Sequence, residues 1–134
     1  MEPAIAIGSE ILRTAASWLT AGRREHERAR RDAAGKLRSV VTEALVQLAD
    51  ADPHSVLARY KLPLGAAIGE VQALSTGRRR ARFDAAVSHL QSCRDAVQPA
   101  LLTFYESQVT GRPTDSSATA RLIAALRALS LAAA

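Results

Sequence analysis

Few residues in this chain have the type and spacing that catalytic or metal chemistry requires. His89 and Cys93 are four residues apart and would share one face of a helix, where an imidazole and a thiolate can bind a metal ion. A structural zinc site usually needs four ligands, however, and Cys93 also belongs to an apolar stripe. We therefore interpret the pair as a buried thiol beside a surface imidazole.

Two carboxylates, Asp50 and Asp52, lie close together, as the acids of a general acid–base pair do. Asp52 stands directly before Pro53, however, and this order is typical of the start of a helix, so capping is its expected role. His54 follows in the first turn, and His26 lies in a charged stretch. No glycine-rich phosphate loop, nucleophile elbow or zinc-spaced Cys/His cluster accompanies them. We expect no enzyme activity, no cofactor, no metal site and no small-molecule substrate.

Arginine is the residue type in this chain that most suggests a binding function. The chain has 18 basic residues, of which all but Lys36 and Lys61 are arginine, and a net charge of +5. Two clusters, Arg23–Arg38 and Arg78–Arg82, together carry a net charge of +8, so the rest of the chain is acidic. The candidate basic patch consists of Arg23, Arg24, Arg28, Arg30, Arg31, Lys36, Arg38, Arg78, Arg79, Arg80 and Arg82.

Concentrated positive charge is what binding to a phosphate backbone requires, so nucleic-acid binding is one hypothesis for this patch. Acidic neighbours favour a solvated, ion-paired surface instead, as in the expected Arg80–Asp84 pair at helical spacing. Phe83 is the aromatic residue nearby, and it belongs to the expected core, so base stacking has little support. An acidic protein surface is the third alternative.

The stretch Ala4–Ala21 is predicted to be an amphipathic helix. It carries Glu10 and Arg13 and is about 18 residues long, shorter than a membrane span, and it lacks the basic start of a signal peptide. Its candidate apolar interface consists of Ile5, Ile11, Leu12, Trp18 and Leu19. Attachment to a membrane surface is the least favoured use of this face, because its polar stripe has few basic residues.

The composition predicts an all-α protein with a single helical domain over residues 1–134. Hydrophobic residues make up 48% of the chain and charged residues 23%, which is typical of a folded domain, and alanine and leucine favour helix. The single Cys93 excludes an intramolecular disulfide, so the fold must depend on its core. We expect a cytoplasmic location.

The apolar periodicity places the first two helices. One long helix is expected from about residue 4 to 50, roughly 70 Å in length at 1.5 Å per residue. Asp52 is then expected to cap a short helix that runs through Tyr60, and Pro63 is expected to end it. Whether residues 64–109 form one helix or two is left open by the sequence.

The second half of the chain shows a heptad pattern. Phe83, Leu90, Val97 and Phe104 are each seven residues apart, with Pro99 expected to kink the helix between them. A loop over residues 110–117 follows, in which Asp115 or a nearby serine can cap the last helix. The expected apolar stripe of that helix consists of Ala118, Leu122, Ala125, Leu126, Leu129 and Ala133.

The order and lengths of these expected helices predict a small helical bundle, in which the C-terminal helix covers a long antiparallel hairpin. If residues 64–106 are nearly collinear, the hairpin folds about residue 57 and places Arg80 opposite residue 34. The run Arg78–Arg82 would then lie beside the basic part of the first helix. This geometry requires that Gly77 is not a sharp turn.

The segments from Asp52-Pro53-His54 to Gly77-Arg78-Arg79-Arg80-Ala81-Arg82-Phe83-Asp84-Ala85-Ala86-Val87 resemble a pattern in small uncharacterised helical bacterial proteins. In those proteins an apolar N-terminal helix and a charged neck precede a basic run followed by Phe-Asp-Ala-Ala. They often have tryptophan where Val87 stands here. The resemblance implies a helical architecture and no activity.

Three hypotheses for function follow. The first is a non-enzymatic helical protein-interaction module, either self-associating as a homodimer or acting as a small inhibitor that docks on a larger machine. The second is a nucleic-acid-binding protein that uses the Arg-rich patch. The third is peripheral membrane attachment through the N-terminal helix.

Overall fold

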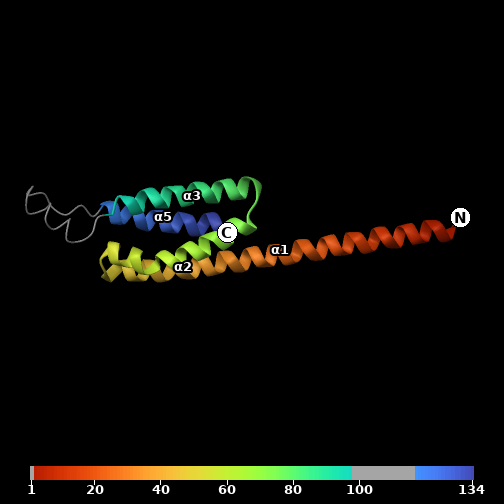
Figure 1. Cartoon of the computed structure of the whole chain (residues 1–134), viewed down its shortest axis with the longest axis horizontal. Coiled ribbons are helices and arrows are strands. Elements are labelled where there is room, and N and C mark those ends of the chain that lie inside the picture. The colour runs from red at the N-terminus through yellow and green to blue at the C-terminus, as the bar shows by residue number, and fades with distance from the viewer. Residues whose placement is uncertain (1, 98–116) are drawn as a thin grey trace, which may run out of the picture.

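The computed structural model describes residues 2–97 and 117–134, with side chains from residue 17 onward. Within these ranges the chain forms four helices and no strand, which confirms the all-α fold class. Figure 1 shows the helices side by side, with one helix extending far beyond the rest. None of the described helices is both long and apolar enough to cross a membrane.

Helix α1 (Glu2–Asp50) is continuous, as the sequence predicts, and has 49 residues. The glycines Gly22 and Gly35 lie inside it without interrupting it. Its C-terminal half buries one stripe against the other helices, because apolar residues recur there at helical spacing. The buried residues of this stripe are Ala33, Ala34, Leu37, Val41, Ala44 and Leu48.

Helix α2 (Pro53–Leu74) begins as predicted, with Asp52 accepting a hydrogen bond of 3.1 Å from the backbone N–H of Ser55. The expected end before Pro63 is wrong, because the helix continues through this proline. Pro63 is exposed, so water can reach the carbonyl group that loses its hydrogen bond. Buried residues on both sides of it, Val56 and Leu64, pack α2 onto α1 and hold the helix together.

The chain reverses sharply after α2, which corrects the expectation that residues 64–106 are nearly collinear. Ser75 and Thr76 are extended, and Gly77 has a φ of 61°, a conformation that glycine adopts at little cost. Helix α3 (Gly77–Asp95) then runs antiparallel to α2 (Figure 1). Residues 64–95 therefore form two helices.

Helices α3 and α5 (Ser117–Ala133) contribute the rest of the core. Phe83, Leu90 and Cys93 are buried in α3, and Val97 beyond it is half-buried, in agreement with the heptad pattern. In α5 the buried residues are Leu122, Ala125, Leu126, Leu129 and Ala133, and Ala118 is half-buried. Pro99, Phe104, Asp115 and most of the expected loop lie outside the described residues.

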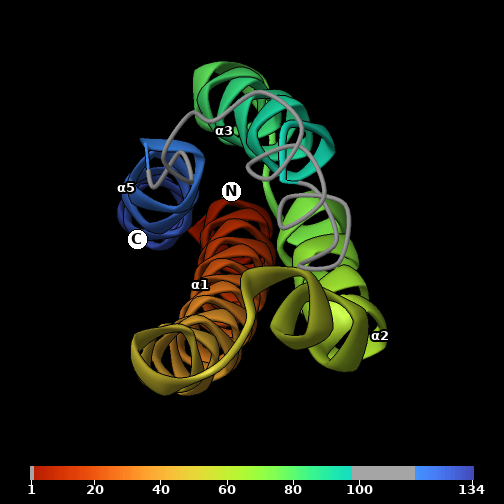
Figure 2. The same cartoon turned by 90° about the vertical axis from the view of Figure 1, so that its left-hand side faces the viewer.

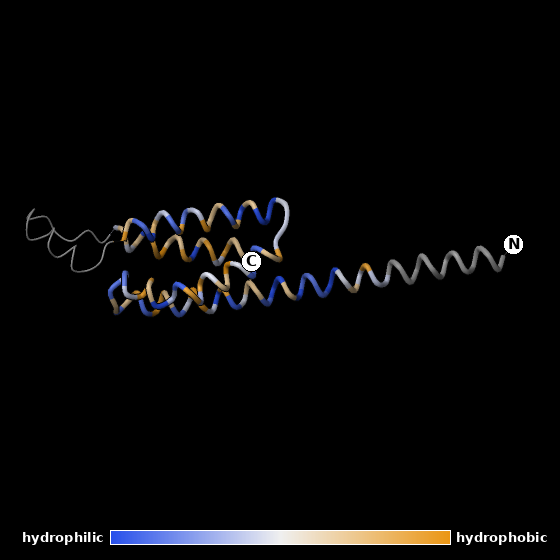
Figure 3. The backbone as a smooth tube through the Cα atoms, in the orientation of Figure 1, coloured by the Kyte–Doolittle hydropathy of each residue, from blue (hydrophilic) through white to orange (hydrophobic). Residues whose placement is uncertain are grey.

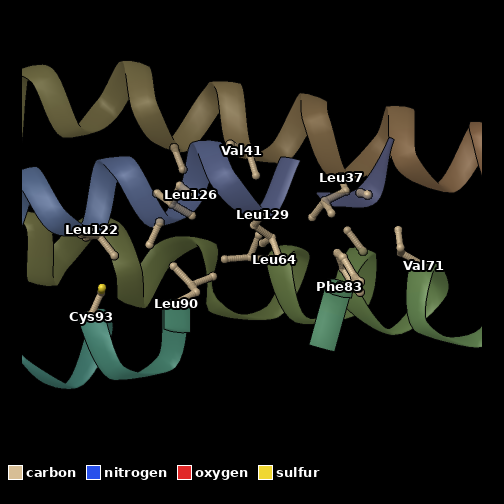
Figure 4. Close-up of a cluster of buried hydrophobic side chains, with 14 of the residues drawn as sticks. Leu37, Val41, Leu64, Val71, Phe83, Leu90, Cys93, Leu122, Leu126 and Leu129 are labelled. Carbon is tan, nitrogen blue, oxygen red and sulfur yellow. The ribbon is translucent and has the colours of Figure 1, made fainter. Parts of the chain in front are cut away.

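The helices form a bundle in which α1 pairs with α2 and α3 pairs with α5 (Figure 2). Helix α5 also contacts α1, and α3 contacts α2, so the hairpin is covered by α3 as well as by the C-terminal helix. Side chains from all four helices meet in one apolar core, seen in Figure 4 with Val41, Leu64, Phe83 and Leu126. This core holds the C-terminal half of α1 in the bundle, and the N-terminal half extends beyond it.

Candidate interaction surfaces

The N-terminal half of α1 extends beyond the bundle without contacting the other described helices (Figure 1). We call residues 2–26 the arm; at 1.5 Å per residue it is about 37 Å long. Trp18 and Leu19 on the arm are 76% and 68% exposed. The side chains of the other candidate interface residues, Ile5, Ile11 and Leu12, lie outside the described part.

An open hollow follows one face of the arm toward the bundle. It is lined by Trp18, Leu19, Gly22, Arg23, His26 and Glu27, which fall on successive turns of α1. Its lining is mostly apolar, and its charged members Arg23 and Glu27 lie toward the bundle, where Figure 3 shows hydrophilic residues along α1. Small-molecule sites are enclosed clefts lined by several elements, whereas this hollow is open and lined by α1 alone.

Arg30 is buried where the arm meets the bundle. It donates to both carboxylate oxygens of Glu27, with Nη2–Oε1 at 2.7 Å and Nε–Oε2 at 3.3 Å. Its Nη1 also donates to the carbonyl oxygen of Ala134 at 3.3 Å, which ties the end of α5 to α1. Such charge-assisted bonds offset the cost of burying a guanidinium group. Arg30 is therefore a structural member of the candidate basic patch.

Glu27 gathers three arginines from two helices. Besides Arg30, its carboxylate oxygens lie 3.5 Å from Nε of Arg31 and 3.9 Å from Nη1 of Arg79. The hydrogen bond from Arg30 and the charges of Arg30, Arg31 and Arg79 lower the pKa of Glu27 against a smaller opposing effect of desolvation. The same hydrogen bond raises the pKa of Arg30.

The contact of Arg79 with Glu27 brings the two arginine clusters together. The sequence predicted this proximity, but from a collinear second arm that placed Arg80 opposite residue 34. In the structure the turn at Gly77 brings the first turn of α3 to the base of the arm instead.

Arg80 closes the turn between α2 and α3. Its Nε donates to both oxygens of Asp84 at 3.0 Å, which confirms the expected pair. Its Nη1 donates to the backbone carbonyl of Gln72 at 2.7 Å, and the side-chain amide of Gln72 donates to Asp84 at 3.0 Å. The role of Gln72 was missed, because nothing in its own neighbourhood indicates that α3 folds back onto it.

The remaining members of the candidate patch are at the surface. Lys36 pairs with Glu70 of α2 at 3.6 Å, and Arg31 and Arg79 share Glu27. The others are exposed and form no ion pair with another described residue: Arg23, Arg24, Arg28, Arg38, Arg78 and Arg82.

The first turn of α3 adds to this positive surface. It contains arginines and no acidic residue, and Thr76 makes no side-chain capping bond there. Because the N-terminal end of a helix carries partial positive charge, basic residues at this position are electrostatically unfavourable unless an anion is nearby.

The residues considered for chemistry lie apart from both surfaces. Cys93 is buried and its Sγ is 3.8 Å from Nε2 of the exposed His89, which confirms a buried thiol beside a surface imidazole. Asp52 caps α2, as predicted. In the part of the chain that the structure describes, no three His, Cys, Asp or Glu residues are grouped as a metal site.

Comparison with models of protein families, with curated proteins and with solved structures found no significant match. The exposed face of the arm and the arginine surface at its base are therefore the features of the chain that indicate a function.

Proposed function

We propose that this chain is a non-enzymatic helical interaction module that self-associates through its arm. The observation that carries the proposal is the exposure of Trp18 and Leu19 on a helix that extends beyond its own bundle. Fully burying one large apolar side chain contributes about 1.5–3 kcal/mol, so pairing of two arms gains several such contributions.

The isolated arm has a second physical reason to find a partner. Most helices in proteins are held by tertiary packing of one face, because a single helix in water is only marginally stable. The arm contains Gly8 and Gly22, and each costs about 1 kcal/mol relative to alanine in a helix interior. A facing helix supplies the packing that the bundle does not give to this segment.

Light scattering over a range of micromolar concentrations tests self-association. The expected result is a dimer that the double variant Trp18→Glu with Leu19→Glu converts to a monomer. The matched control is Val46→Glu, which changes a 62% exposed apolar residue near the other end of α1 and should leave the dimer intact. A wild-type chain that stays monomeric, or a double variant that stays dimeric, contradicts the proposal.

Docking of the arm on a different, larger protein uses the same face and leaves the isolated chain monomeric. Co-sedimentation with anionic vesicles tests the third use, attachment to a membrane surface. A dimer that does not co-sediment with such vesicles supports self-association over membrane attachment.

A second candidate function, nucleic-acid binding, is favoured by the contact of Arg79 with Glu27. It makes a single basic surface from two helices, and in α3 Arg78 and Arg82 add exposed arginines that form no ion pair with another described residue. Binding to a phosphate backbone should weaken steeply as salt rises. The test is titration of a DNA duplex at about 50 mM salt and upward.

The best variant for that titration replaces Arg78, Arg79 and Arg82 with glutamine and keeps Arg80, which closes a turn. A matched control replaces Arg59, Arg94 and Arg121, so that net charge changes equally at a distance. Loss of binding with the first set alone supports the function. Equal losses, or no binding of the wild-type chain, contradict it.

A further inference from the structure

The arm has a heptad pattern that pairs large residues with small ones. Ile5, Leu12 and Leu19 are seven residues apart, and three residues after each stands a small residue, in the order Gly8, Ala15 and Gly22. Because α1 is one continuous helix over this range, the six positions form a single stripe along it. For residues 5–15 this placement follows from the helical register alone.

The way two such stripes match depends on their direction. In a parallel pair each position faces its own copy, so Gly8, Ala15 and Gly22 face one another and leave gaps. In an antiparallel pair the layers alternate: Ile5 faces the second copy's Gly22, Leu12 faces Ala15, and Leu19 faces Gly8. Every layer then combines one large and one small residue, which fills space evenly.

Among the described residues, Gly22 gives the most direct support for the antiparallel arrangement. A Cβ atom built on Gly22 would meet nothing within 4 Å, so no contact inside the chain requires glycine there. Glycine in a helix interior costs about 1 kcal/mol relative to alanine. Gly35, Gly65 and Gly69 have the same open space, so Gly22 differs from them by its place on the stripe, where the second copy's Ile5 would lie over it.

Charge favours the same direction. The far end of the arm carries Glu2 and Glu10, while its base carries Arg23 and Arg24 beside Glu25, so the two ends have net charges of −2 and +1. An antiparallel pair places Glu2 within about one helical turn of the other copy's Arg23. A parallel pair would place the two basic bases side by side, and like charges at such a seam are unfavourable.

We infer that the partner of the arm is a second copy of this chain, held antiparallel by the stripe from Ile5 to Gly22. The two-fold axis lies between Arg13 and Thr14, and the two bundles stand at opposite ends of the paired arms. This inference rests on the proposed function and adds the direction and register of the pairing.

A distance between spin labels at residue 26 distinguishes the two directions. The labelled variant is His26→Cys in a Cys93→Ala background. With the axis near residue 13.5, the antiparallel arrangement separates the two labels by about 40 Å, whereas a parallel pair brings them to about 10 Å. A dimer with the short distance overturns this inference but leaves self-association standing. A monomer overturns both.

Gly22→Leu provides an independent test. In the antiparallel dimer the added side chain collides with the partner's Ile5, and we expect dimerisation to weaken by about tenfold or more. In a parallel dimer two leucines would meet and strengthen the pair. The control, Gly69→Leu on the exposed face of α2, has open space and should not change the dimer. Unchanged or tighter dimerisation of Gly22→Leu overturns the inference.

Discussion

Nη1 of Arg79 in α3 lies 3.9 Å from Oε2 of Glu27 in α1. This contact joins two clusters of arginines that are far apart in the sequence, at the point where the arm leaves the bundle. The same carboxylate binds Arg30, whose guanidinium group also holds the end of α5. Glu27 therefore contacts α3 directly through Arg79, and the end of α5 is joined to α1 through Arg30, which Glu27 holds.

Replacing Glu27 with glutamine should lower the stability of the bundle. The buried Arg30 would lose its charged partner, and Arg31 and Arg79 would face it without a counter-charge. Thermal unfolding should show a lower Tm for Glu27→Gln. The control Glu43→Gln, an exposed position on the same helix, should leave the Tm unchanged. Equal Tm values for both variants would show that Glu27 has no structural role.

The lowered pKa of Glu27 predicts how stability depends on pH. A carboxyl whose pKa is lower in the folded state stabilises the fold above its ordinary value of 4.5 and loses that contribution as pH falls below it. Urea midpoints measured between about pH 6 and pH 3 should therefore fall for the wild-type chain. The fall should be smaller for Glu27→Gln. A steeper acid loss in the variant would contradict this account.

Removing the guanidinium group of Arg80 should weaken the turn between α2 and α3. Arg80→Ala deletes the bond to the Gln72 carbonyl and the pair with Asp84, and because the group is partly exposed we expect a loss of about 1 kcal/mol. The neighbouring Arg82→Ala, which removes no described ion pair, should change stability by less than about 0.5 kcal/mol. Chemical denaturation compares the two.

Two glycine-to-alanine variants should change stability in opposite directions. Gly77 has a φ of 61°, where an alanine costs about 1–2 kcal/mol, so Gly77→Ala should destabilise the bundle. Gly69 lies inside α2 with open space around a built Cβ, so Gly69→Ala should stabilise by about 0.5–1 kcal/mol. If the turn at Gly77 were absent, the two variants would change the free energy of unfolding, measured in urea, in the same direction.

Much of this fold is predictable from local sequence. The continuity of α1, the cap at Asp52, the buried stripe of α5 and the Arg80–Asp84 pair all depend on residues within a few turns of one another. Such features follow from helical spacing and capping chemistry alone.

The predictions from sequence were wrong where contacts between residues far apart in the chain decide the structure. Pro63 usually ends a helix, but contacts with α1 hold α2 together around it. The turn at Gly77 depends on α3 finding a place beside α5, and the burial of Arg30 depends on the end of α5 reaching it. These relationships join residues far apart in the chain, and periodicity in one segment carries no information about them.

Trp18 offers the most direct measurement of the central claim, because it is the only tryptophan in the chain and lies 76% exposed on the arm. Its fluorescence can be followed while the wild-type protein is diluted from high to low micromolar concentration. If the arms pair, the emission at high concentration lies at shorter wavelength and resists quenching by acrylamide, and dilution reverses both. Emission typical of exposed tryptophan at every concentration, with constant quenching, would contradict self-association through the arm.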